Sequence, residues 1–192
     1  MQPLREEPHL FCGFRPELVE AWYTHIHGSL LGQLDAQRAL YEALAPRVLH
    51  TCKRYFADEA EAEDAMIRTM TTMFQQLPTI REPKALPAWL RRTAVNECLM
   101  ELRKRRTERL DEADLPELGT SSTDSMHDRE ALMAVLRQLP DGYRSVFNLY
   151  AIEGYSHAEI AEQLGISEAT SKSQLSRARQ WLQRRLANFN VQ

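Results

Sequence analysis

The segment from Tyr155 to Arg179 constrains the fold most, because it contains the local signals of two short helices separated by a tight turn. Ser156, followed three residues later by Glu159, forms a capping box that begins the first helix. Gly165 falls where the chain must leave this helix, which favours a positive φ there. Ser167 is well placed to cap the second helix. This order of signals predicts a helix-turn-helix motif.

The second helix of the motif has an apolar side and a cationic side. The apolar side consists of residues at three- or four-residue spacing, namely Leu175, Ala178, Leu182 and Leu186. Hydroxyl and basic residues lie off this stripe, at Thr170, Lys172, Ser173, Ser176, Arg177 and Arg179. From Thr170 to Leu186 there are five cations, Lys172, Arg177, Arg179, Arg184 and Arg185, and no carboxylate. Attraction to phosphate is therefore unopposed, and we interpret this side as a DNA-binding surface. The alternative is a solvated helix of an ordinary bundle.

Charge is divided unevenly along the 192 residues, although the formal net charge is -3. Residues 1–106 contain 15 Lys and Arg against 14 Asp and Glu. Residues 107–128 contain one against seven, and residues 129–192 contain eight against six. Because the basic residues are local and the acidic excess lies in the middle, the near-neutral total does not exclude a nucleic-acid-binding protein.

Several other classes of protein do not fit the sequence. No apolar run approaches the roughly 18–20 residues of a membrane span and no signal pattern is present, so we expect a cytoplasmic protein. The three cysteines, Cys12, Cys52 and Cys98, are far apart, and we expect reduced, half-buried thiols. We predict no cofactor, and no metal site from Cys12, His25 and His27. No Ser/His/Asp order, metal-ligand spacing or Gly-rich phosphate loop is present, so we do not expect an enzyme.

Strong helix formers dominate the chain, which has seven glycines and no alternating strand pattern of useful length. The predicted fold is all-α, with two small helical domains joined by an acidic flexible linker, the C-terminal domain being a helix-turn-helix. We place an N-terminal extension at residues 1–29, the first domain at 30–106, the linker at 107–128 and the second domain at 129–192. The linker has too few apolar groups to fold, and is either a solvated tether or a mimic of nucleic acid in a partner's basic channel.

Apolar spacing predicts helices at residues 16–27, 36–56, 59–77, 88–106, 129–139 and 143–153, ahead of the helix-turn-helix. Pro46 lies inside the second of these and is tolerated only if the helix restarts or kinks there. Met66, Met70 and Met73 share one side of the third helix, which favours core packing over an adaptable partner surface. The last of these helices is predicted to contribute Val146, Phe147, Leu149 and Tyr150 to the core.

The helix at residues 88–106 is a second candidate surface, because an aromatic residue lies among polar and cationic ones. The polar side consists of Arg91, Arg92, Asn96, Arg103, Lys104, Arg105 and Arg106. With Trp89 it would suit melted nucleic acid, where bases stack and phosphates pair. Equally, Trp89 belongs to the core and the basic run is favoured by the helix dipole. These residues alone leave both interpretations open.

Residues 139–179, LPDGYRSVFNLYAIEGYSHAEIAEQLGISEATSKSQLSRAR, closely resemble region four of the sigma-70 family. Residues 36–65 and 87–106 resemble region two of an extracytoplasmic-function (ECF) sigma factor, and the resemblance covers roughly residues 30–186 in the right order. It implies an alternative sigma factor that binds the clamp and flap regions of core RNA polymerase and directs transcription initiation. The first domain would recognise and melt the -10 promoter element, and the second would read the -35 element in duplex DNA. An anti-sigma partner is also implied.

The resemblance further implies two sets of DNA-binding residues and one set of polymerase-binding residues. The -35 set is Lys172, Ser173, Ser176 and Arg177, supported by Thr170 and Arg179. The -10 set is Trp89, Asn96, Arg103 and Lys104, with Lys84 in the loop at residues 79–86 that captures a flipped base. The polymerase-binding set is Asp64, Ile67, Arg68 and Met70.

The polymerase-binding set departs from the family pattern. Where the family usually has a Gln-Glu or Gln-Asp pair and then a Phe, this chain has Ile67, Arg68 and Met70. Arg68 reverses a charge at the expected interface, where like-charge contacts can cost several kcal/mol. Two alternatives therefore stay open: a degenerate sigma-like decoy that binds an anti-sigma factor but not polymerase, and a stand-alone helix-turn-helix transcription regulator.

Overall fold

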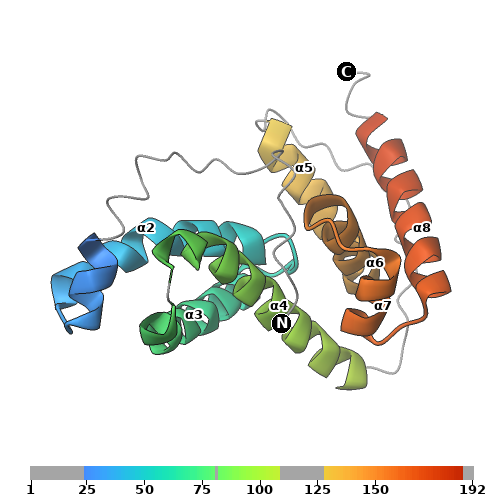
Figure 1. Cartoon of the computed structure of the whole chain (residues 1–192). Helices are drawn as coiled ribbons and strands as arrows, with labels where there is room; N and C mark the ends of the chain where they lie inside the picture. Colours follow the sequence, from blue (N-terminus) through green and yellow to red (C-terminus); the bar gives the residue numbers. More distant parts are fainter. Residues whose placement is uncertain (1–23, 81, 109–127, 188–192) are drawn as a thin grey trace.

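The computed structural model describes residues 24–80, 82–108 and 128–187, and every element in these ranges is helical. A helical segment at residues 24–30 precedes the helices of the first half, α2 (Leu34–Cys52), α3 (Glu59–Gln76) and α4 (Leu86–Glu108). Two short 3-10 turns, η1 (Leu77–Thr79) and η2 (Pro83–Ala85), lie between α3 and α4. The second half contains α5 (Asp128–Arg137), α6 (Asp141–Phe147), the π-helical turn η3 (Asn148–Ile152), α7 (His157–Leu164) and α8 (Glu168–Ala187) (Figure 1). The predicted all-α fold with two helical domains is confirmed.

Helices α2, α3 and α4 pack on one another and form the first helical unit (Figure 1). Each contributes a buried apolar stripe, which includes Leu40, Leu44 and Val48 from α2, Met66, Met70 and Met73 from α3, and Leu90, Val95 and Leu99 from α4. The methionines therefore form core, as predicted. Helix α3 begins as the sequence indicates, because the Asp58 side chain accepts hydrogen bonds from the backbone N–H groups of Ala60 and Glu61 at 2.8 and 3.3 Å.

Helix α2 contains Pro46 and ends earlier than predicted. The helix is continuous through Pro46, so of the restart and the kink that the sequence allowed, a restart does not occur. Pro46 and Glu42, whose carbonyl loses its usual partner, are both exposed, so water can satisfy the carbonyl. The helix ends at Cys52 rather than at residue 56, yet Tyr55 and Phe56 beyond it are fully buried. Most of the predicted helix at residues 16–27 and of the linker at 107–128 lies outside the described residues.

The second helical unit consists of α5 to α8, with α6 and α7 both packed on α8 (Figure 1). The predicted helix at residues 143–153 is instead α6 followed by η3, in which the N–H of Glu153 donates to the carbonyl of Asn148 at 3.0 Å. This i to i+5 turn is wider than an α-helical turn and shifts the residues within it around the axis. Leu149 is buried as predicted, whereas Tyr150 is 36% exposed, so the core role predicted for Tyr150 is wrong.

A buried ion pair joins the two helical units. The carboxylate of Glu153, at the end of η3, accepts a hydrogen bond from Arg54 Nη2 at 2.8 Å and lies 3.4 Å from Arg91 Nε. The Glu153 side chain is 4% exposed and that of Arg54 is 11% exposed. Beside them, Asn148 Nδ2 donates to the carbonyl of Arg54 at 2.7 Å. The two predicted domains therefore contact each other directly.

Arg144 is the second polar link between the units and is 2% exposed. Its Nε donates to the carbonyl of Tyr55 at 2.9 Å, its Nη1 donates to the carbonyl of Arg137 at 2.9 Å, and its Nη2 pairs with Asp141. Burial lowers the pKa of Arg144 from its ordinary value, and the nearby Asp141 carboxylate opposes that shift. The side chain connects α6 to the end of α5 and to the segment after α2.

Replacing Arg144 with Met, which has a similar length, should destabilise the protein strongly. The variant leaves the carbonyl groups of Tyr55 and Arg137 without this donor, and we expect the free energy of unfolding to fall by about 3 kcal/mol. Urea unfolding followed by circular dichroism measures this change. Arg38→Met is the matched control, because Arg38 pairs with Glu42 on the exposed surface of α2 and should matter little. Equal unfolding midpoints for the two variants would show that Arg144 does not link the units.

Candidate nucleic-acid interface

Helices α7 and α8 form the helix-turn-helix that the sequence predicts. Ser156 Oγ accepts from the N–H of Glu159 at 3.3 Å, and the Glu159 carboxylate accepts from the N–H of Ser156 at 2.8 Å. Gly165 ends α7 with a φ of 62°, in the left-handed region. Ser167 Oγ accepts from the N–H of Thr170 at 3.0 Å and so caps α8. All the local signals in this segment are confirmed.

Helix α8 presents its predicted polar side to solvent. Leu175, Ala178 and Leu182 are buried, as is Ser171 at the start of the helix. Most of the predicted -35 residues are exposed, namely Lys172, Ser173, Ser176, Arg177 and Arg179, while Thr170 is half-buried. The helix therefore separates an apolar side that packs on the second unit from a polar side that is accessible.

Two buried residues of α8 were missed or misplaced by the sequence analysis. Trp181 is 7% exposed and packs in a cluster with Val135 and Leu136 of α5. Arg185 is also 7% exposed, so the prediction that it adds to the cationic surface is wrong. Residues 178, 181, 182 and 185 continue the same helical stripe, and this spacing could have identified both side chains as inward-facing.

One carboxylate lies next to the cations of α8. Glu168 Oε1 is 2.7 Å from Lys172 Nζ, one turn further along the helix. The hydrogen bond and the charge of Lys172 lower the pKa of Glu168 below its ordinary value. Both side chains are more than half exposed, and such a pair contributes little to stability. Lys172 can therefore exchange this carboxylate for another anion at small cost.

The predicted -10 residues differ in their accessibility. Asn96, Arg103 and Lys104 on α4 and Lys84 in η2 are exposed. Arg103 Nε also donates to the carbonyl of Leu99 at 3.4 Å, within the same helix. Trp89 is half-buried and packs against the core of the first unit, so the core interpretation describes part of its role.

The predicted polymerase-binding residues also divide into exposed and buried ones. Asp64, Ile67 and Arg68 are exposed on α3, with Ile67 52% exposed. Met70 is 2% exposed and lies in the core, so its side chain is not available to a partner and its assignment to this set is wrong. The spacing of residues 66, 70 and 73 explains why, because it places Met70 on the inward side of the helix.

Arg68 has two acidic neighbours within the chain. Its Nε is 3.8 Å from Glu97 Oε2 and its Nη2 is 3.8 Å from Glu101 Oε2, both on α4. Glu101 also lies 3.6 Å from Arg105, whose Nη1 is 2.8 Å from Glu61. The cation that departs from the family pattern is therefore part of a network of alternating charges between α3 and α4.

The remaining chemical features of the described residues do not indicate a catalytic site. Cys52 and Cys98 are fully buried, rather than half-buried as predicted, and a hydrogen bond to Cys52 together with burial raises the pKa of Cys98. Such thiols react slowly. Within the described ranges no group of three His, Cys, Asp or Glu could hold a metal ion. None of the described helices is long and apolar enough to span a membrane.

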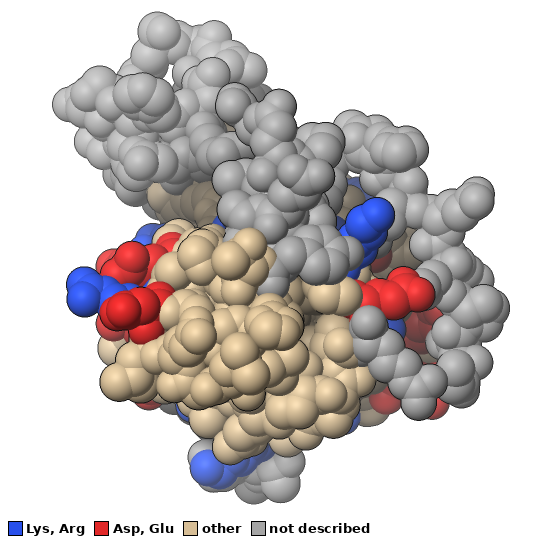
Figure 2. Space-filling model, turned by 60° about the vertical axis from the view of Figure 1, so that its left-hand side comes forward, with Lys and Arg blue, Asp and Glu red and all other residues tan. Residues whose placement is uncertain are grey.

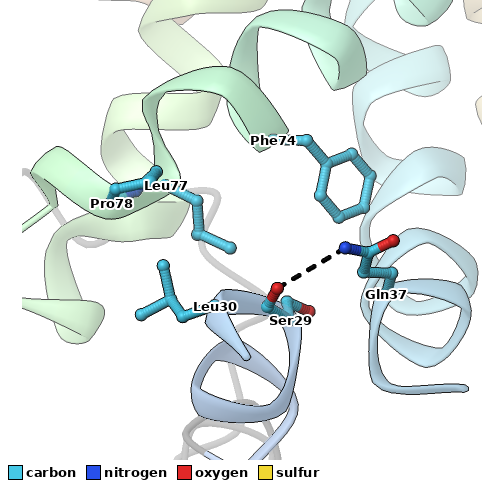
Figure 3. Close-up of a pocket in the computed structure, with 6 residues that line it drawn as sticks. All are labelled: Ser29, Leu30, Gln37, Phe74, Leu77 and Pro78. Carbon is cyan, nitrogen blue, oxygen red and sulfur yellow. Dashed lines mark hydrogen bonds between the residues drawn. The ribbon is translucent and has the colours of Figure 1, made fainter. Parts of the chain in front are cut away.

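A shallow pocket of about 370 Å³ lies away from the helix-turn-helix, at the start of α2 (Figure 3). Its lining is neutral and consists of Ser29, Leu30, Gln37, Phe74, Leu77 and Pro78, with Gln37 Nε2 donating to the carbonyl of Ser29 at 3.4 Å. Figure 2 shows this end of the molecule, where a wide area has neither basic nor acidic side chains. The pocket therefore has neither titratable groups for catalysis nor cations for nucleic acid.

A helix-turn-helix whose second helix exposes cations is typical of DNA-binding proteins. Two family models match the chain, "Sigma-70 region 2" over residues 40–108 and "Sigma-70, region 4" over residues 129–182. The chain is 31% identical over 175 residues to the ECF RNA polymerase sigma factor SigL of Mycobacterium tuberculosis, covering 88% of this chain and 98% of SigL. It is 33% identical over 132 residues to the RNA polymerase sigma-E factor of Streptomyces coelicolor, covering 68% and 75%.

Among solved structures, the sigma factor RpoE of Bartonella quintana, in complex with the anti-sigma factor NepR, is 23% identical. The match covers 78% of this chain and 96% of RpoE, with a TM-score of 0.47. On the sequence matches, the chain belongs to the ECF sigma factors of the sigma-70 family. The interpretation as an alternative sigma factor is thereby confirmed.

Replacing Ser156 with Ala removes the hydroxyl that caps α7 and should lower the free energy of unfolding by about 1 kcal/mol. Chemical unfolding followed by tryptophan fluorescence is a suitable measurement, because Trp181 lies on the adjoining helix α8. Ser176→Ala is the control, since Ser176 is exposed in the interior of α8, where alanine favours helix. A Ser156→Ala protein as stable as the control would mean that the capping box does not hold the motif together.

Proposed function

We propose that the chain is the promoter-specificity subunit of a bacterial RNA polymerase, acting in the cytoplasm without catalytic chemistry of its own. In this proposal the exposed side of α8 reads the -35 element in the major groove of duplex DNA. The observation that carries the proposal is the polar side of α8, where Lys172, Ser176 and Arg177 are exposed together on a capped helix. Cations on this side supply affinity for phosphate, and hydroxyl groups can reach base edges.

The -10 element would meet the first helical unit. Support comes from the exposed Asn96, Arg103 and Lys104 on α4 and the exposed Lys84 beside it in the chain. Cations pair with the phosphates of a melted strand, and Asn96 offers both a donor and an acceptor to an unpaired base. Trp89, packed on the core, would support this surface with the part of its ring that is exposed.

Core polymerase would bind the outward side of α3 through Asp64, Ile67 and Arg68. An exposed isoleucine suits an apolar anchor, and the charges around it suit a polar rim. Helix α3 turns its other side to the core of the unit, so this surface can bind a partner without any change in helix packing. An anti-sigma factor is the further partner that the family resemblance implies, and it stays a prediction.

The double variant Lys172→Ala/Arg177→Ala should abolish transcription from a promoter that the unmodified holoenzyme transcribes. Such a promoter is obtained by selection from random duplex templates with core polymerase and this chain. The variant loses two cations of the reading surface, whereas the surface on α3 is unchanged, so binding to core polymerase should persist. Run-off transcription and a pull-down of core polymerase measure the two activities.

The control for this variant is Arg38→Ala, which removes an exposed cation of α2 and should transcribe normally. Loss of polymerase binding in the double variant would mean that the reading surface is misplaced. Tight duplex binding by the chain without polymerase would instead favour the stand-alone regulator.

Ile67→Asp should weaken binding of core polymerase by at least tenfold, because a carboxylate replaces the apolar anchor and a hot-spot residue contributes roughly 2 kcal/mol. Leu34→Asp is the matched control, since Leu34 is 78% exposed at the start of α2. Fluorescence anisotropy with labelled chain measures both affinities. An unmodified chain that fails to bind polymerase at all, with Arg68→Gln binding in its place, would move the function to the decoy.

A further inference from the structure

Three side chains form a continuous stack on the surface of the second helical unit. The guanidinium carbon of Arg179 lies over the ring of Tyr150, 5.2 Å from its centroid. The ring of Tyr150 stacks on that of His157, with centroids 4.6 Å apart and planes at 26°. The residues come from α8, η3 and α7, so three elements meet at one point beside the helix-turn-helix. No role in DNA recognition was predicted for Tyr150 or His157.

The inner end of the stack is held in place. His157 Nδ1 is 2.9 Å from Ser171 Oγ, and Ser171 is fully buried on α8. A hydrogen bond to a buried hydroxyl fixes the orientation of the imidazole ring, and the fixed ring in turn restricts Tyr150. His157 is also the first residue of α7, whose start is held by the capping box at Ser156. The aromatic pair is therefore a rigid surface, although Tyr150 is 36% exposed.

The outer end of the stack lies among the cations of α8. Lys172, Ser176 and Arg179 are four and three residues apart, a spacing that places them on one side of a helix. All three are exposed. A free arginine on a helix surface samples many rotamers, whereas a guanidinium held over a tyrosine ring is already oriented. The stack thus extends the row of Lys172 and Ser176 with a preorganised cation.

We propose that Tyr150, supported by His157, is a positioning residue that holds Arg179 for contact with a phosphate of the DNA backbone beside the groove that α8 reads. Arginine suits a phosphate because its planar fork makes two parallel hydrogen bonds. A backbone contact orients the helix on DNA but carries no base information. The proposal rests on the proposed function, because it requires that α8 bind DNA.

The test uses holoenzyme assembled from core polymerase and the full chain, titrated with promoter duplex over a range of salt concentrations. Tyr150→Leu removes the aromatic ring and keeps the size of an apolar side chain, while Tyr150→Phe keeps the ring. For Tyr150→Leu we expect weaker binding and a slope of log Kobs against log[salt] that is smaller in magnitude by about 1, the loss of one phosphate contact. For Tyr150→Phe the slope should stay that of the unmodified chain.

Two further comparisons separate positioning from a structural role. Arg179→Ala should reproduce the salt slope of Tyr150→Leu. The combined variant Tyr150→Leu/Arg179→Ala should bind DNA as tightly as either single variant, because both changes remove the same contact. The ratio of affinities for the promoter and for a duplex with an altered -35 element should not change in either variant. Ser176→Ala, in contrast, should change that ratio, since the proposed function has this hydroxyl group reach base edges.

An unaltered salt slope for Tyr150→Leu and Arg179→Ala, in an experiment where Lys172→Ala/Arg177→Ala lowers affinity, would overturn the proposal and leave the proposed function intact. No effect of any of these variants would overturn the proposed function itself. If Tyr150→Leu unfolds, the separate variants Arg179→Ala and Tyr150→Phe test the phosphate contact instead. Arg179 is exposed, so its replacement does not disturb the core. A normal slope for Arg179→Ala then refutes the phosphate contact.

Discussion

The contact between the two described helical units is built around the carboxylate of Glu153, which lies between Arg54 and Arg91. A carboxylate that is 4% exposed is costly to bury unless it is paired. Arg54 and Arg91 both compensate this charge, and removal of Glu153 would leave the 11% exposed Arg54 without its carboxylate, so the arrangement tolerates little change there. Glu153 therefore ties the end of η3 to the first unit in one orientation.

The contact between the units also provides hydrogen-bond donors for the carbonyl groups that follow α2. The helix stops at Cys52, and the carbonyl groups that follow have no partners within it. Asn148 and Arg144 donate to the carbonyls of Arg54 and Tyr55, so the second unit supplies the hydrogen bonds that the first unit lacks. The apolar core continues across the contact, since Val146, Leu149 and Ile160 belong to the same buried cluster as α2, α3 and α4. The two helical units are thus joined by hydrogen bonds and by apolar packing in the same region.

Local signals explain what could be predicted from the sequence. The capping box at Ser156, the left-handed Gly165 and the cap at Ser167 each depend on residues three or four apart, and each is found in the structure. The contacts of Glu153 and Arg144 could not be predicted in this way, because Arg54 lies 99 residues from Glu153 and nothing near either residue indicates the other. Tyr150 was misplaced for a different reason: a helical period of 3.6 does not apply to the π turn of η3.

The division between helix packing and surface chemistry is clearest on α3, where the chain departs from its family. The inward side of α3 consists of alanines, methionines and Thr69, and the exposed side carries Ile67 and Arg68. Because Arg68 lies 3.8 Å from Glu97 and Glu101 and is 42% exposed, it is compensated without being buried. A pair of this kind contributes little to stability, so a partner's carboxylate could replace Glu97 or Glu101 at small cost. At Ile67 and Arg68 the departure therefore changes the chemistry that α3 presents to a partner, whereas at Met70 it lies in the core.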